Sequence, residues 1–194
     1  PSVTNKPGAR SGAVSWTGSD GRLWLMGGSG YAQTGSGDLN DLWSYDPQSG
    51  YWTWQAGDSV INSFGNYGTK GIPSSFNKPR ARSGAVSWTG NDGRLWLMGG
   101  KVNYQYSYGD LNDLWSYDPQ TGFWTWQAGS IYVNQEGNYG TRGVPDPSNM
   151  PGSRYGHVAW KDNNGRFWLS GGNISISQGG NNAYFNDLWS FDVQ

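Results

Sequence analysis

Short runs of apolar and aromatic residues follow one another along the chain, separated by polar segments rich in Gly, Asn, Asp and Pro. The runs are rich in aromatic or β-branched residues and end at turn-forming residues, which is typical of β-strands. No apolar pattern with a 3.6-residue period extends over the length of a helix. The first unit of this pattern predicts four strands, at Ser11–Thr17, Leu23–Gly28, Asp41–Asp46 and Tyr51–Gly57.

Two turn signals predict how these strands are connected. Asp20-Gly21 lies between the first and second strands, and this dipeptide favours the positive φ angles of a tight hairpin. Pro47-Gln48-Ser49-Gly50 lies between the third and fourth strands and also predicts a short turn. The four strands therefore form an antiparallel meander. One such sheet cannot bury both of its faces, so we expect neighbouring sheets to stack around an axis, as in a β-propeller.

The whole pattern recurs every 72 residues. The segment Pro1–Arg10 returns at Pro73–Arg82 and at Pro145–Arg154. The first two copies are identical at 51 of 72 positions, which indicates duplication rather than convergence. The third copy reaches Gln194, and we expect it to lack its fourth, outer strand. The three units are repeat 1 (residues 1–72), repeat 2 (73–144) and repeat 3 (145–194).

Composition explains how such sheets could hold together. Hydrophobic residues make up only 35% of the chain, but it contains 13 Trp, 12 Tyr and 6 Phe. Each aromatic ring can bury roughly 150–250 Å², so a few rings per repeat can hold an interface between sheets. The 32 glycines show no collagen-like period and favour short strands joined by tight turns.

Charge and cysteine content exclude several classes of function. The formal net charge is −1, which argues against a nucleic-acid partner and against strong electrostatic attraction to a membrane. No apolar run approaches the roughly 20 residues that span a bilayer, so we expect no membrane insertion. The absence of cysteine excludes disulfides, thiolate metal sites and cysteine nucleophiles.

Three features in combination resemble the kelch-repeat family. They are a Gly-Gly pair at the end of the second strand, a Tyr in the third strand, and a Trp after six intervening residues. In repeat 3 the Tyr is replaced by Phe191, and the Trp is absent. The matching residues are Gly27, Gly28, Tyr45 and Trp52 in repeat 1, Gly99, Gly100, Tyr117 and Trp124 in repeat 2, and Gly171, Gly172 and Phe191 in repeat 3.

The resemblance implies kelch-type β-propeller blades, each a four-stranded antiparallel meander. The chain would supply about 2.7 blades, an incomplete ring on its own, because such propellers close with about six or seven. The Asp-Leu-Trp-Ser-Tyr-Asp-Pro segment and the long loop after the fourth strand are similar to secreted bacterial kelch-repeat proteins. We therefore expect an extracellular or cell-surface protein. We also expect it to assemble with other copies of itself or with additional blades of a longer chain.

Two connections in each repeat are long and differ between copies. The loop between the second and third strands, Ser29–Asn40 in repeat 1, matches its counterpart at only 5 of 12 positions. The loop after the fourth strand has about 25 residues, against the usual 2–6. Variable loops on a constant scaffold are suited to recognition. The candidate ligand or partner contacts in them are Tyr31, Tyr104, Tyr106, Tyr108, Tyr132 and Tyr184, together with Asn181 and Asn182.

Other recurring residues favour structural roles. The loop tyrosines themselves could pack the loops in place of an apolar core. Recurring tryptophans predict packing between repeats, and these are Trp16, Trp24, Trp43, Trp52 and Trp54 in repeat 1. Arg10, Arg82 and Arg154 precede the first strand of each repeat, and Asp41, Asp113 and Asp187 open the third. An Arg–Asp link between strands is the favoured interpretation, and a ring of arginines around an anionic ligand is the alternative.

The sequence offers little for catalysis. Galactose-oxidase-like enzymes contain kelch blades, and their copper chemistry needs several histidines and a cysteine-linked tyrosine. This chain has one histidine, His157, which stands where the other repeats have Ala13 and Ala85. One imidazole cannot form a copper or zinc site, and no nucleophile-elbow motif supports a serine nucleophile. Most of the 14 acidic residues recur at turns or strand boundaries, which favours structural roles over paired catalytic carboxylates.

These observations predict a non-catalytic interaction or structural module without a cofactor or metal. Its partners would be further blades, and a protein or a glycan bound by the long loops. The alternatives are a carbohydrate-binding propeller module and the non-catalytic part of a galactose-oxidase-like enzyme.

Overall fold

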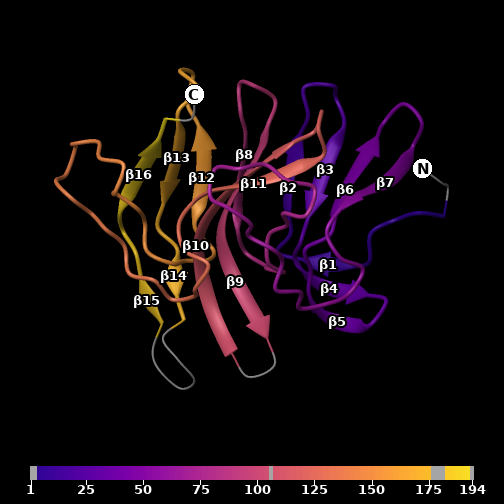
Figure 1. The fold of residues 1–194 in the computed structure, drawn as a ribbon, viewed down its shortest axis with the longest axis horizontal. Coiled ribbons are helices and arrows are strands. Elements are labelled where there is room, and N and C mark those ends of the chain that lie inside the picture. The colour runs from indigo at the N-terminus through magenta and orange to yellow at the C-terminus, as the bar shows by residue number, and fades with distance from the viewer. Residues whose placement is uncertain (1–3, 105–106, 176–181, 193–194) are drawn as a thin grey trace.

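The chain forms an all-β structure of antiparallel sheets arranged side by side (Figure 1). The computed structural model describes residues 4–104, 107–175 and 182–192. Within these ranges no residue is helical, so no helix could cross a membrane.

Repeat 1 contains a four-stranded meander in the order β2-β3-β6-β7 and a small sheet in the order β1-β4-β5. The meander strands are β2 (Val14–Thr17), β3 (Leu23–Met26), β6 (Leu42–Asp46) and β7 (Tyr51–Ala56). The small sheet consists of β1 (Arg10–Ser11), β4 (Ser29–Ala32) and β5 (Gly35–Asp38).

Repeats 2 and 3 follow the same plan. The meander of repeat 2 runs in the sheet order β8-β9-β10-β11, and that of repeat 3 in the order β12-β13-β16. A separate pair, β14-β15, belongs to repeat 3. The strands of repeat 2 are β8 (Val86–Thr89), β9 (Leu95–Tyr104), β10 (Ser107–Asp118) and β11 (Phe123–Ala128). Those of repeat 3 are β12 (Val158–Lys161), β13 (Phe167–Ser170), β14 (Asn173–Ile174), β15 (Ala183–Tyr184) and β16 (Leu188–Phe191).

The structure confirms the four predicted strands of repeat 1 and corrects the segment between the second and third. The first strand begins at Val14 rather than Ser11, because Ser11 pairs with Ser29 in the small sheet. The segment Ser29–Asn40 was expected to be a loop, but most of it forms the β4–β5 hairpin. In repeat 2 the corresponding hairpin is a direct extension of β9 and β10. All three hairpins project from the same end of the sheets, and the short turns lie at the other end (Figure 1).

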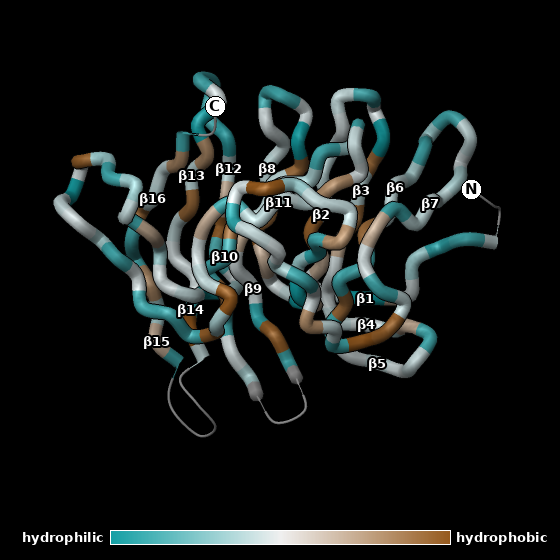
Figure 2. The backbone as a smooth tube through the Cα atoms, in the orientation of Figure 1, coloured by the Kyte–Doolittle hydropathy of each residue, from teal (hydrophilic) through white to brown (hydrophobic). Residues whose placement is uncertain are grey.

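The core lies between the sheets of successive repeats. Val14, Trp16 and Trp24 of repeat 1 pack in one buried cluster with Leu95 and Trp115 of repeat 2. A second cluster joins repeat 2 to repeat 3 and includes Trp88, Trp96 and Phe167. Figure 2 shows hydrophobic residues along the strands and hydrophilic residues in the short turns.

The tryptophans of repeat 1 divide between two environments. Trp16 and Trp24 are buried against repeat 2, as predicted. Trp43 and Trp52 are only half-buried, and Trp54 is exposed, so the expected packing of these three residues between repeats is wrong for repeat 1 within the described residues. These three residues lie on the face of the sheet opposite to the one that contacts repeat 2.

Backbone contacts also join the repeats. The amide of Gly84 donates to Gly12 O at 2.8 Å, and the amide of Gly156 donates to Gly84 O at 2.9 Å. Gly28 N donates to Arg82 O of the next repeat at 2.8 Å, in a left-handed conformation with φ of 91°. A Cβ at Gly28 would lie 2.7 Å from Ser11 O, so the Gly-Gly pair is needed for close backbone approach.

Candidate functional site

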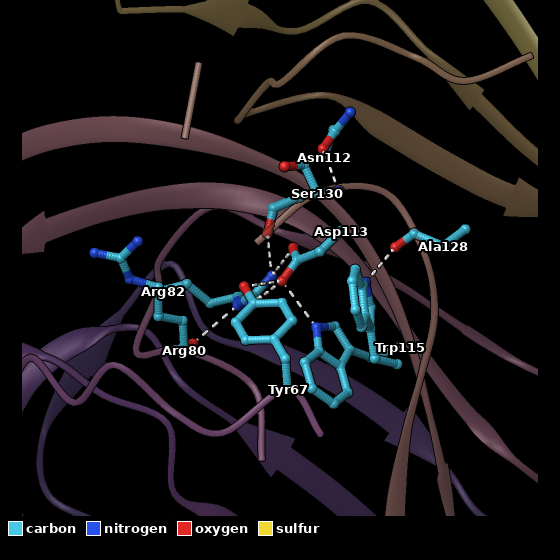
Figure 3. A network of polar contacts seen from close by, with 10 residues as sticks. Tyr67, Arg80, Arg82, Asn112, Asp113, Trp115, Ala128 and Ser130 are labelled. Carbon is cyan, nitrogen blue, oxygen red and sulfur yellow. Dashed lines mark hydrogen bonds and ion pairs between the residues drawn. The ribbon is translucent and has the colours of Figure 1, made fainter. Parts of the chain in front are cut away.

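A buried ion pair anchors the scaffold of each repeat, and Figure 3 shows the one in repeat 2. Arg82 donates through Nη1 and Nη2 to the two carboxylate oxygens of Asp113, at 2.6 and 2.7 Å. Nη1 also donates to Gly99 O at 2.9 Å. Trp115 Nε1 and the Tyr67 hydroxyl donate to Asp113 Oδ2 at 2.8 and 2.6 Å. Burial raises the pKa of Tyr67 far above its usual range, and the charge of Asp113 adds to this effect, so Tyr67 remains a donor.

The same pair recurs as Arg10–Asp41 and Arg154–Asp187, each with a closest N–O distance of 2.6 Å. The structure thus confirms the predicted Arg–Asp links. The three arginine side chains are 5%, 1% and 0% exposed, so they do not line a surface for an anionic ligand. Each link joins the residue before the first strand to the start of the third, and holds the base of the hairpin between them.

Buried aspartates connect the hairpins of successive repeats. Asp38, at the end of β5, accepts a hydrogen bond from Asn103 N of β9 at 2.7 Å. Asp110 of β10 accepts one from Ser175 N in the same way. Both carboxylates are fully buried, and burial raises the pKa of each. The positive charge of Lys101 acts against this effect and lowers both pKa values, but the effect of burial is larger.

The long loop after the fourth strand braces the hairpin of its own repeat. Asn62 N donates to Asp38 O at 2.7 Å, and Asp38 N donates to Asn62 Oδ1 at 2.9 Å. Asn134 and Asp110 make the same two bonds in repeat 2, at 2.8 and 2.9 Å. Both asparagines have φ of 57°, a left-handed conformation that Asn tolerates better than most residues. The hairpins of repeats 1 and 2 are therefore each held by two sets of contacts: the aspartate that bonds to the next repeat, and the long loop of the same repeat.

The structure brings most of the candidate tyrosines to this braced end of the molecule. Tyr31 lies on β4, Tyr108 on β10 and Tyr184 on β15, and all three are exposed. We call the surface formed by the β4–β5, β9–β10 and β14–β15 hairpins the hairpin face (Figure 1). Tyr132 is also exposed and precedes Val133, which packs against Gly109 of β10.

Three further candidates complete the comparison. Tyr104 is the last residue of β9, so its backbone also belongs to the hairpin face. Tyr106 and Asn181 lie outside the described residues. Asn182 is exposed beside β15.

Repetition in the variable loops marks residues that the sequence interpretation missed. Tyr67 and Tyr139 stand in register 72 positions apart, and each hydroxyl donates to the aspartate of the next ion pair. Asn62 and Asn134 are in register too, as are Asp38 and Asp110. Their recurrence within otherwise divergent segments is the signal that could have identified them. Much of the long loop therefore packs on the next repeat instead of facing a partner.

His157 occupies a structural position. It is buried and lies close to the backbone of Gly99 and of Gly172. Burial, reinforced by the charge of Arg154, lowers the pKa of His157 to about 3, so the ring is neutral at physiological pH. Across the described ranges, no group of three or more His, Cys, Asp or Glu residues is placed to hold a metal ion.

Comparisons with known proteins show a likeness to solved structures. No protein-family model matches the chain, and no curated protein sequence matches it. Among solved structures, one titled "Structure of YjhT" is similar, with a TM-score of 0.48 and 18% sequence identity. The match covers 84% of this chain and 59% of that structure, so the chain spans less than two thirds of its length.

Proposed function

We propose that the chain is a non-catalytic, extracellular recognition module built from kelch-like β-propeller blades. It binds a partner through the hairpin face. The observation that carries this proposal is the exposure of Tyr31, Tyr108 and Tyr184 on three hairpins. Hydrogen bonds that the buried carboxylates of Asp38 and Asp110 accept from backbone amides connect the first two hairpins to the next repeat. The Gly-Gly, Tyr and Trp pattern and the stacked meander sheets support the kelch-like architecture.

The hairpin face has the properties that recognition requires. Its backbone is fixed by the buried Asp38 and Asp110, so little conformational entropy is lost when a ligand binds. A tyrosine presents a large rigid ring and a hydroxyl at low entropic cost. The side chains on the hairpins differ between repeats although the scaffold is constant. Such a surface can change specificity without changing the fold.

A glycan is the second candidate ligand. Exposed tyrosine rings can stack on sugar rings, and their hydroxyls can bond to sugar hydroxyls. Asn182, exposed next to the β15 strand, adds an amide donor and acceptor to the same end of the molecule. The near-neutral net charge fits an uncharged oligosaccharide better than a polyanion.

The test compares the 194-residue chain with a triple variant, Tyr31→Ser, Tyr108→Ser and Tyr184→Ser. Both are applied to an array of immobilised oligosaccharides and to an array of purified extracellular proteins. We expect the wild type to bind at least one probe and the triple variant to bind it about tenfold more weakly or less, since aromatic residues dominate binding energy.

The matched control is Tyr51→Ser, because Tyr51 is an exposed tyrosine on β7, away from the hairpin face. It should bind like the wild type. Glycan binding would select the second candidate over a protein partner. Equal binding by wild type and triple variant, or no binding to either array, would show that the hairpin face is not a recognition surface.

A further inference from the structure

Each sheet has two faces that play different parts in the stack. In repeat 1, Val14, Trp16, Trp24, Met26 and Leu42 lie on the face that contacts repeat 2, which we call the rear face. In repeat 2, Leu95, Leu97, Trp115, Tyr117 and Trp124 lie on the face that receives it, which we call the front face. The contact includes Trp24 and Tyr117, whose ring centroids are 5.6 Å apart.

Repeat 3 carries a rear face that none of the described residues covers. Its residues are Val158, Trp160, Trp168, Ser170 and Leu188, of which four match repeats 1 and 2 in type. Trp160 is 44% exposed, whereas Trp16 and Trp88 are 5% and 4% exposed. Leu188 is 58% exposed, whereas Leu42 is fully buried.

Repeat 1 carries the complementary front face, on which no other repeat packs within the part of the chain that the structure describes. Its residues are Leu23, Leu25, Trp43, Tyr45 and Trp52, and all five match the front face of repeat 2 in type. Leu23 is 45% exposed, whereas its counterpart Leu95 is fully buried. The chain thus presents the two halves of its own internal interface, one at each end of the stack.

Directional hydrogen bonds fix how a rear face meets a front face. Trp16 Nε1 donates to Trp96 O at 2.9 Å, and Trp88 Nε1 donates to Trp160 O and Trp168 O at 3.1 and 3.2 Å. The next donor in this series is Trp160, on the uncovered rear face. The matching acceptor, Trp24 O, belongs to the repeat with the uncovered front face. The uncovered faces and this donor–acceptor pair therefore specify the same orientation for a contact between repeat 3 of one chain and repeat 1 of another.

We propose that a second copy of this chain docks head to tail, with the rear face of repeat 3 on the front face of repeat 1 of its neighbour. The contact reproduces the interface between repeats 1 and 2. It goes beyond partner recognition and does not depend on the hairpin face, so failure of one proposal leaves the other standing. Such heterologous contacts generate a ring if the rotation closes and an open chain if it does not.

Two substitutions make this contact weaker than the internal ones. Tyr184 stands where Asp38 and Asp110 bind the hairpin of the next repeat, so that hydrogen bond has no counterpart. Ser170 stands where Met26 and Met98 fill the core. We therefore expect association that reverses on dilution instead of a permanent dimer.

The test measures the mass in solution of the wild type and of two single variants by sedimentation equilibrium over a range of concentrations. Leu23→Glu damages the front face, and Trp160→Glu damages the rear face. Both residues are half-exposed in the monomer, so the fold should survive, which circular dichroism checks. We expect the wild type to reach at least twice 21.3 kDa, and each variant to associate at least about 30-fold more weakly. The control Phe76→Glu alters a more exposed aromatic residue on neither face and should behave like the wild type.

Mixing the two variants tests the head-to-tail orientation. The Leu23→Glu chain keeps an intact rear face, and the Trp160→Glu chain keeps an intact front face. Their mixture should form a 1:1 dimer that grows no further, although each variant alone is monomeric. An interface in which like faces meet would instead let one variant dimerise alone: Trp160→Glu if front faces meet, and Leu23→Glu if rear faces meet.

A cross-link gives a measurement that does not depend on damaging either face. Thr89 Oγ1 donates to Thr17 O, and Lys161 Nζ donates to Thr89 O. Positions 17, 89 and 161 are therefore equivalent positions that lie next to one another in successive repeats. The chain has no cysteine, so the double variant Thr17→Cys and Lys161→Cys should be joined between copies by a short bis-maleimide. A wild type of 21.3 kDa at all concentrations, self-association of either variant at wild-type strength, or no cross-link would overturn the proposal.

Discussion

His157 is the residue at which repeat 3 departs from the alanines of the other two repeats. Its pKa of about 3 in the folded protein lies below the usual value of about 6.5. Between these two values the unfolded chain binds a proton that the folded protein does not. The contribution of neutral His157 to the free energy of unfolding is therefore fully present above about pH 6.5, and it is lost as the pH drops toward 3.

We predict that His157→Ala removes this acid sensitivity. Lost packing lowers stability equally at all pH values, but the contribution of the histidine between pH 7 and pH 4, about 3 kcal/mol, should disappear. Urea unfolding of wild type and variant at both pH values measures the difference. The same loss of stability on acidification in both proteins would show that His157 is not its source.

At the scale of strands and loops, the sequence predicted the elements whose formation depends on the residues within them. The aromatic runs and the Asp20-Gly21 turn were sufficient for the meander strands. The β4–β5 hairpin was missed because Gly35 and Gly37 favour loops, and the hairpin is held by distant contacts from Asn62 and Asn103. For the same reason the exposure of the candidate tyrosines could be anticipated from loop variability, but their placement on connected hairpins could not.

Asn134 should show how strongly the long loop braces a hairpin. We predict that Asn134→Ala lowers the free energy of unfolding by about 2–3 kcal/mol, through a lost hydrogen bond and a strained left-handed backbone. Asn134→Gly loses the side-chain bond without the strain and should cost only about 1 kcal/mol. Urea unfolding measures both values, and amide exchange at Asp110 should accelerate in both variants. Equal costs for Ala and Gly would contradict the role assigned to the backbone conformation.

For the whole molecule, equivalent positions in similar repeats acquire different environments from their place in the stack. Leu95 and Leu23 occupy equivalent positions, but only Leu95 has a repeat packed against it. Sequence comparison between repeats predicts a shared fold and cannot reveal this difference. Stability in such a stack is a sum of repeat and interface contributions, so equivalent substitutions should not be equivalent in cost.

The three Arg–Asp pairs allow this idea to be tested with one substitution. Asp113 is completely buried and is bound by Tyr67 from the preceding repeat, whereas the side chain of Asp41 is 12% exposed. We predict that Asp113→Asn costs about 3–5 kcal/mol, because it leaves the charge of Arg82 buried without its partner. Asp41→Asn should cost less, about 1–3 kcal/mol, because water can reach the Arg10 pair. Urea unfolding of the two variants gives the comparison. Equal losses would mean that each pair acts within its own repeat, and that position in the stack contributes nothing to its strength.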